Sequence, residues 1–124
     1  MREFKFRAWD KIFNEMYGEI TELDFEFDRI FVRENEMEND FDIPRSRVVL
    51  MQWTGLKDKN GVEIYEGDIV DIDSDEDKYL EVFYGNKNGS FQLKRLKSRI
   101  ILPMTILYDC DNYEVVGNVF ENPE

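Results

Sequence analysis

At 124 residues the chain is about the size of one domain, and we expect a single domain over residues 1–124. Its 28 acidic and 16 basic residues give a formal net charge of −12, which argues against coating nucleic acid or anionic membranes, because their phosphates would repel the chain. Hydrophobic residues make up 42% and aromatic residues 15%, so the chain can build a core and global disorder is not expected.

The sequence signals for cellular location favour the cytoplasm. Cys110 is the only cysteine, so no internal disulfide can form, which suits a reducing compartment. The first six residues lack the apolar run of a signal peptide, and no apolar segment approaches the ~20 residues that span a bilayer. We therefore expect a cytoplasmic protein with no membrane partner.

The N-terminal residues predict a hairpin. Residues 3–9 alternate between two faces, as a half-buried strand does. Residues 10–14 supply turn formers, and Met16 and Tyr17 begin a return strand. Residues 3–18 are therefore expected to form two antiparallel strands.

Most of the acidity lies in residues 19–42, which hold ten acids and two arginines, a net charge of −8. Leu23, Phe25 and Phe27 alternate with acids there, and this pattern predicts a strand. Over residues 34–45 further acids occupy alternate positions, and their mutual repulsion would oppose ordering. We expect that segment to be a mobile loop.

Residues 47–72 predict the centre of the fold. The strand 47–53 has apolar residues on both faces, as a central strand does. The turn 58–61 ends in Asn-Gly, and these residue types accept the positive φ that tight hairpin turns require. A short strand follows, and a Gly-Asp pair leads into a further strand at 69–72. Three short strands joined by two tight turns are expected to nucleate a small β core.

The remaining residues continue the pattern of short strands. Residues 79–84 and 90–93 predict a second hairpin, and residues 113–120 predict a last strand. Pro103 ends an apolar run, which places that run near an edge or a bend of a sheet, and residues 104–108 fit either a strand or one helical turn. Together the elements predict a mainly β fold: a small antiparallel barrel-like fold with an SH3-like core, an N-terminal hairpin and little helix.

The sequence offers little for catalysis. It has no histidine, so it lacks the commonest general base and the usual zinc ligand. Thiolate–imidazole catalysis is excluded as well, because the single cysteine has no histidine to act with it. The glycines fit neither a Walker A loop nor a dinucleotide fingerprint, and Gly55 and Gly61 are assigned to strand-connecting turns. The chain has enough carboxylates to form the pair that glycoside hydrolysis uses, as any acidic protein does, but nothing in the sequence singles out two of them.

The acids at residues 71–77 are spaced in part like the ligands of a calcium-binding EF-hand loop. Neither the register that starts at Asp71 nor the one that starts at Asp73 works, because both lack glycine at the sixth position and glutamate at the twelfth. A solvated acidic turn is the preferred interpretation. We therefore expect no enzyme, and we assign no catalytic residue, no cofactor and no metal ion.

The chain has one basic patch, which falls in a stretch without acids. It consists of Lys87, Lys94, Arg95, Lys97 and Arg99. The patch would suit nucleic acid, with Phe91 stacking on a base, although the alternation of Phe91 with Leu93 favours a core role. It would equally suit the acidic residues 19–42, within one subunit or between subunits.

The run Gln52-Trp53-Thr54-Gly55-Leu56-Lys57-Asp58-Lys59-Asn60-Gly61-Val62-Glu63-Ile64-Tyr65-Glu66-Gly67-Asp68-Ile69-Val70 resembles the signature of the YopX family. These are small proteins encoded by phages and prophages, mostly of Gram-positive bacteria. Residues 5–10 and 114–124 resemble the two flanking motifs of that family. The motif residues, which we expect to be structural, are Trp53, Thr54, Gly55, Leu56, Asp58, Gly61, Tyr65, Gly67 and Asp68.

The resemblance implies little about activity, since the family has no established molecular function or catalytic residues. It implies a homo-oligomer in the cytoplasm of a bacterial host cell. The residues themselves leave three hypotheses open. The first is a self-associating interaction or structural protein with a host or phage protein as a further partner. The second, from the basic patch, is a nucleic-acid-associated small β-barrel module, and the third, from the net charge of −12, is an acidic DNA mimic that inhibits a host enzyme. We favour the first hypothesis, because catalytic groups are lacking and the acidic and basic segments are separate.

Overall fold

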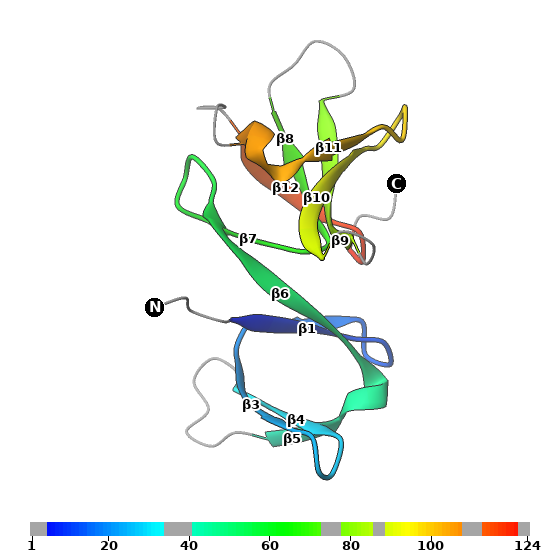
Figure 1. Cartoon of the computed structure of the whole chain (residues 1–124). Helices are drawn as coiled ribbons and strands as arrows, with labels where there is room; N and C mark the ends of the chain where they lie inside the picture. The colour runs from blue at the N-terminus through cyan, green and yellow to red at the C-terminus, as the bar shows by residue number, and fades with distance from the viewer. Residues whose placement is uncertain (1–4, 34–40, 73–77, 86–88, 108–112, 122–124) are drawn as a thin grey trace. The chain divides into compact units, whose positions relative to one another are not determined.

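The computed structural model describes residues 5–33, 41–72, 78–85, 89–107 and 113–121 (Figure 1). The chain divides into two compact units, Met1–Trp53 and Thr54–Glu124. Strand β6 (Val48–Lys57) continues through the boundary and contributes to both units. The expected single domain stays a prediction.

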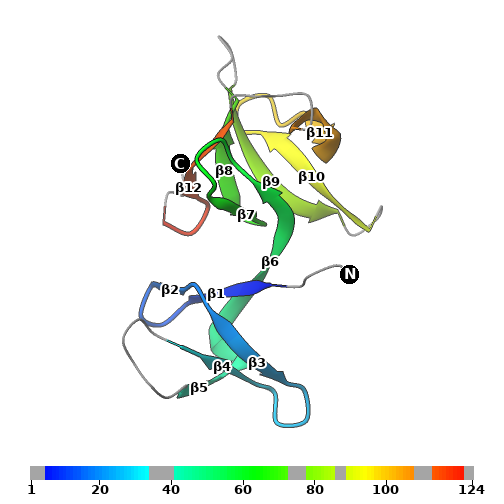
Figure 2. The same cartoon turned by 90° about the vertical axis from the view of Figure 1, so that its left-hand side faces the viewer.

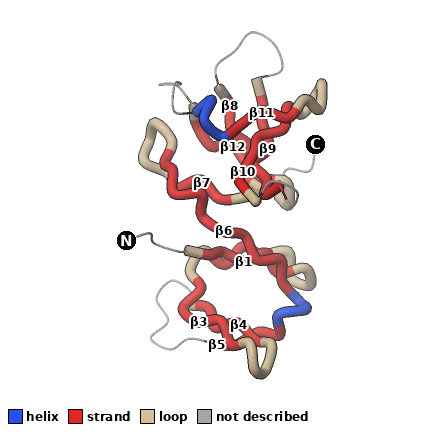
Figure 3. The backbone as a smooth tube through the Cα atoms, viewed as in Figure 1, coloured by secondary structure: helices blue, strands red, loops and turns tan. Residues whose placement is uncertain are grey.

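The N-terminal unit consists of short antiparallel strands and one 3-10 helix (Figure 3). Its elements are β1 (Phe6–Asp10), β2 (Glu15–Tyr17), β3 (Ile20–Asp24), β4 (Arg29–Val32), β5 (Phe41–Pro44), η1 (Arg45–Arg47) and the first part of β6. Strand β1 lies between β2 and β6, while β3, β4 and β5 form a separate sheet in that order. Both sheets contribute to one hydrophobic core, made of Ala8, Tyr17, Ile30, Val32, Ile43 and Val48.

The predicted N-terminal hairpin is confirmed. Strands β1 and β2 pair antiparallel, with Trp9 opposite Met16. The prediction of a half-buried strand is wrong for the end of β1, where Ala8, Trp9 and Asp10 are all buried. The reason is that β1 is an inner strand, with a neighbour on each edge.

Two predictions for the acidic segment are wrong. Phe25 and Phe27 do not continue a strand, because β3 ends at Asp24 and residues 25–28 form a turn. Residues 41–44, predicted as part of a mobile loop, form strand β5 against β4. Burial of Ile43 in the core favours this strand, and the ion pair between Arg29 and Asp42 offsets part of the acidic repulsion. Residues 34–40 of the predicted loop lie outside the described part of the chain.

The C-terminal unit is built around a five-stranded antiparallel sheet, which curls into a half-barrel (Figure 2). Its elements are the end of β6, β7 (Glu63–Tyr65), β8 (Asp68–Asp71), β9 (Tyr79–Gly85), β10 (Ser90–Arg95), β11 (Ile101–Pro103), η2 (Met104–Leu107) and β12 (Glu114–Asn118). The strand order in the sheet is β11-β10-β9-β8-β12, and β7 pairs with β6. The core of this unit consists of Ile64, Val70, Leu80, Val82, Leu93 and Leu107.

The central strand–turn–strand–turn–strand prediction is confirmed by β6, β7 and β8. Strand β6 is longer than predicted and reaches Lys57, so Gly55 lies inside a strand rather than in a connecting turn. Gly55 has a φ of +91°, a left-handed conformation that glycine adopts without steric cost. Gly61, with a φ of +82°, lies in the turn before β7, as predicted.

The fold class is mainly β, as predicted. The strand pairings whose register is defined within the described residues are antiparallel. The helices within the same residues are the two short 3-10 segments η1 and η2. The segment left open in the sequence, residues 104–108, contains η2, and Pro103 lies on the edge strand β11. None of the helices in the described residues has the length and apolar character to span a bilayer.

Candidate functional site

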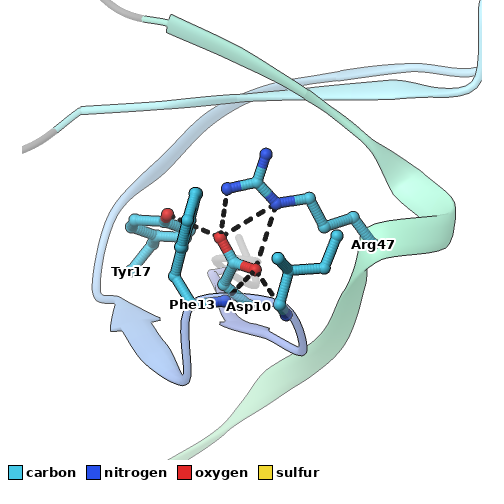
Figure 4. A network of polar contacts seen from close by, with 5 residues as sticks. Asp10, Phe13, Tyr17 and Arg47 are labelled. Carbon is cyan, nitrogen blue, oxygen red and sulfur yellow. Dashed lines mark hydrogen bonds and ion pairs between the residues drawn. The ribbon is translucent and has the colours of Figure 1, made fainter.

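Asp10 is the centre of a polar network inside the N-terminal unit (Figure 4). Its side chain is 0% exposed. Oδ1 accepts hydrogen bonds from the backbone N–H groups of Ile12 and Phe13, at 2.9 and 3.1 Å. The Tyr17 hydroxyl donates to Oδ2 at 2.8 Å. Arg47 donates from Nη2 to Oδ2 at 2.7 Å and from Nε to both oxygens at 3.1 Å.

These contacts shift the pKa values of the two buried groups away from neutral pH. The Arg47 guanidinium, which outweighs the effect of burial, holds the pKa of Asp10 far below its ordinary value, and Tyr17 and two backbone donors act in the same direction. Burial, together with the hydrogen bond to Asp10, raises the pKa of Tyr17 to about 12. Asp10 is therefore a permanent carboxylate at physiological pH, and its bonds close the β1–β2 turn and attach the start of β6 to it.

Asp58 plays a similar part in the C-terminal unit. Its Oδ1 accepts from the backbone N–H groups of Asn60 and Val62, at 2.8 and 2.9 Å, and its Oδ2 accepts from that of Val115 at 2.9 Å. Burial alone would raise the pKa of Asp58, but the three backbone donors reverse the effect and lower it. One carboxylate thereby closes the turn before β7 and holds β12.

Other motif residues make backbone contacts of the same kind. The Thr54 hydroxyl donates to the Ile64 carbonyl at 2.7 Å, and buried Asp68 accepts from the Tyr65 N–H at 2.8 Å. The Gly67 N–H donates to the Val82 carbonyl at 2.7 Å. These bonds give the motif residues roles in turns and strand pairing, although their expected structural character stays a prediction.

The described residues of the basic patch lie on the hairpin formed by β10 and β11. Lys94 and Arg95 are half-buried on β10, whereas Lys97 and Arg99 are exposed in the turn that follows. The Lys94 Nζ atom lies 5.1 Å from the centre of the Phe83 ring, a cation–π contact. Lys87, predicted as part of the patch, lies outside the described residues.

Residues 94–101, which we name the basic turn, combine charge with exposed apolar side chains. They carry four basic residues and no acid, a formal charge of +4. The turn is closed by the Arg99 N–H, which donates to the Arg95 carbonyl at 3.0 Å, and by the Arg95 N–H, which donates to the Ile100 carbonyl at 2.9 Å. Ile100 and Ile101 are 55% and 54% exposed.

Residues 22–28, which we name the acidic turn, have the opposite composition. They carry four acids and no base, a formal charge of −4. Asp24 Oδ1 accepts from the N–H groups of Glu26 and Phe27, at 3.0 and 3.1 Å, and so fixes the turn between β3 and β4. Phe25 and Phe27 are 79% and 69% exposed.

The sequence-based interpretation missed Asp10 as a network centre and the acidic turn as an exposed apolar site. One signal was available for both. Asp10 is followed four residues later by Asn14, and Asp24 by Asp28, and both of these later residues have a positive φ, 54° and 55°. Asp and Asn tolerate that conformation, and an Asp at the start of a turn accepts the next free N–H groups.

A metal site needs several carboxylate, thiolate or imidazole ligands that meet at one point. No group of three or more Asp, Glu, Cys or His side chains within the described part of the chain could hold an ion together. Residues 73–77, which carry most of the acids considered for calcium, lie outside that part.

The fold and these sites define a small antiparallel β protein in which buried carboxylates close the turns. The chain belongs to the YopX family: the family model described as YopX protein matches residues 5–124. Protein EF1440 from Enterococcus faecalis, a solved crystal structure, is 34% identical to the chain. The match covers 100% of this chain and 98% of that one, with a TM-score of 0.65. No curated protein matches the chain.

Proposed function

We propose that this protein is a non-enzymatic interaction subunit that works by associating with further copies of itself. The observation that carries the proposal is the pair of exposed turns with opposite composition. The acidic turn has a formal charge of −4 and the basic turn one of +4, and each presents two large apolar side chains to solvent. A chain that carries both surfaces has what it needs to bind another copy.

The exposed apolar side chains support an interaction role. Single surface hydrophobics are common, but adjacent large ones rimmed by charge are typical of binding sites. Phe25 and Phe27 at one turn and Ile100 and Ile101 at the other fit that description. Covering these side chains would remove apolar surface from water and favour association.

The state of the buried acids supports a role without catalysis. A general acid or base works best with a pKa near the operating pH. The pKa values of Asp10 and Asp58 are lowered instead, and the pKa of Tyr17 is raised to about 12. Each of these groups is bound to backbone or side-chain partners of its own unit.

The family resemblance supports a phage or prophage origin and a place in the cytoplasm of a bacterial host. Phage genes of related task lie close together, so the neighbouring genes test this part of the proposal. Flanking capsid, replication or lysis genes are expected. A setting among host housekeeping genes alone would contradict the phage origin.

A second candidate function is nucleic-acid binding by the basic turn. The observation in its favour is the set of four basic residues on one hairpin without an acid. Such binding would weaken steeply with added salt, because each neutralised phosphate releases counterions. A titration of fluorescent single- and double-stranded oligonucleotides in low and moderate salt measures it, and no binding at low salt would eliminate this candidate.

Sedimentation velocity over a range of micromolar concentrations tests self-association. The proposal expects the weight-average sedimentation coefficient to rise with concentration, as copies assemble. A coefficient that stays at the value of a monomer up to high micromolar concentration would overturn it.

A further inference from the structure

We infer that the acidic turn of one copy docks against the basic turn of another copy. This inference rests on the proposed self-association and names the two surfaces that carry it. Each contact would therefore join two different stretches of the sequence, residues 22–28 and residues 94–101.

The acidic turn is held in one conformation before any partner binds. The two hydrogen bonds to Asp24 fix its first half. Asp28 adopts a left-handed φ of 55°, and its carbonyl accepts a hydrogen bond from the Arg45 N–H at 2.9 Å. The exposed side chains of Phe25 and Phe27 thus lie on a preorganised backbone, which lowers the entropy lost on binding.

The basic turn is held in a comparable way. Lys94 lies opposite Ile101 in the pairing of β10 with β11. Arg99 has a positive φ of 65°, and the bonds between residues 95 and 99 and between 95 and 100 close the hairpin end. Basic groups and the exposed side chains of Ile100 and Ile101 therefore belong to one short structured element.

The composition of the basic turn indicates what kind of surface it would bind. Four cations call for an acidic surface, and the two exposed isoleucines call for apolar side chains between the acids. A phosphate backbone supplies only the charge. The acidic turn supplies the opposite charge, formally of equal size although the Arg45 guanidinium already lies 4.0 Å from the Asp28 carboxylate, together with the exposed rings of Phe25 and Phe27. A second copy is therefore the occupant that matches both features.

Because the chain has a high net charge, general repulsion and specific docking predict opposite effects of making the acidic turn less negative. With −12 on every copy, general repulsion opposes association, and a change that makes the chain less negative should strengthen association if general charge decides. Specific docking of the acidic turn predicts the reverse, since a less negative acidic turn would attract the basic turn less strongly. Salt dependence alone does not separate these effects, because salt screens both.

The experiment uses two full-length variants and their mixture. The first variant carries Glu22→Lys and Glu26→Lys, both at exposed positions, and its formal net charge is −8 because each change adds two charges. The second carries Lys97→Glu and Arg99→Asp, where aspartate suits the positive φ. A control with Glu15→Lys and Glu121→Lys makes the same change in net charge at exposed positions outside both turns.

Sedimentation velocity on the separate variants gives the expected losses. Each turn variant should show an apparent dissociation constant about tenfold or more above that of the unaltered protein, because the altered turn then has a net charge of zero and no longer attracts its counterpart. The control should associate at least as tightly as the unaltered protein. An equimolar mixture of the two turn variants should regain association, since the unaltered acidic turn of the second variant can then meet the unaltered basic turn of the first. Circular dichroism and thermal unfolding check that each variant folds.

The outcomes separate failure of the docking surfaces from failure of self-association. Unaltered protein that stays monomeric overturns both the inference and the proposed function. Unaltered protein that associates, with turn variants that associate equally well, overturns the docking surfaces alone. The docking surfaces are also overturned if each turn variant folds and loses association but their mixture does not regain it. They are overturned as well if the turn variants lose only oligonucleotide binding and still associate.

Discussion

Arg47 and Asp10 are 37 residues apart in the chain, and the Arg47 guanidinium donates to both oxygens of the Asp10 carboxylate. The carboxylate is fully buried, whereas the arginine side chain is 24% exposed. This contact joins the first strand to the segment that enters β6. The contact also pairs the negative charge of Asp10, which would be costly to bury without a partner.

Replacing Asp10 should destabilise the N-terminal unit. Asp10→Ala removes the acceptor for two backbone N–H groups, for Tyr17 and for Arg47. We expect a loss of about 2–4 kcal/mol in unfolding free energy, somewhat below the cost of orphaning a fully buried charge because Arg47 reaches solvent. Urea unfolding followed by circular dichroism measures it.

A matched control for this change is available in the same unit. Arg29 and Asp42 also form an ion pair, but both side chains are more than a third exposed. Asp42→Ala should therefore cost less than about 1 kcal/mol. Equal losses for Asp10→Ala and Asp42→Ala would contradict the role assigned to the buried network.

Alkaline pH should weaken the fold through Tyr17. Its pKa in the folded protein is about 12, above the ordinary value of about 10, so the folded state favours the neutral phenol. The stability from this group is complete below pH 10 and is lost as the pH rises through 12, by about 3 kcal/mol in all for a shift of about two units.

Unfolding free energy measured in steps across this pH window, for the protein and for Tyr17→Phe, checks this prediction. The variant should be less stable at neutral pH, because Asp10 loses a donor, yet its stability should fall less steeply between pH 10 and 12. Parallel curves for the two proteins would show that Tyr17 titrates normally.

The turn before β7 depends on the left-handed conformation of Gly61. A Cβ added there would meet no atom within 4 Å, so the penalty of Gly61→Ala arises from its φ of +82° alone. We expect a loss of about 1–2 kcal/mol in unfolding free energy. Gly18→Ala is the control, since Gly18 has equal space and no such φ, and it should be neutral or stabilising by up to about 1 kcal/mol. Similar effects at both glycines would refute the argument from backbone conformation.

The exposed phenylalanines of the acidic turn should matter for association and not for folding. Phe25→Ser with Phe27→Ser removes two side chains that are largely in solvent. The unfolding free energy should change by less than about 0.5 kcal/mol per site, as for other surface substitutions. The concentration for half-association, measured by light scattering, should rise several-fold. A loss of stability without a loss of association would mean that these rings pack within the fold.

Local patterns in the sequence predicted most of the fold. Alternation identified β1 and β9, and Asn60-Gly61 identified the turn before β7, because these features depend on a few adjacent residues. The family motif located the central strands for the same reason.

The features that were missed depend on residues distant in sequence. Strand β5 forms because Ile43 reaches the core and Asp42 meets Arg29, neither of which the run of acids reveals. The partner of Asp10 lies 37 residues away. In the acidic turn, alternation predicted a strand. The hydrogen bonds to Asp24 stabilise a turn there instead, and Phe25 is exposed.

The central claim is that the two turns meet between copies, and cross-linking tests it most directly. A carbodiimide joins a carboxylate to an amine only where they touch, so it reports Glu26 against Lys97. The sample is an equal mixture of unlabelled and heavy-nitrogen-labelled protein at a concentration where the protein associates. We predict cross-linked peptides that contain residue 26 from one isotope form and residue 97 from the other. Cross-links between these residues that never mix the two forms, or none at all in associated protein, would contradict the account.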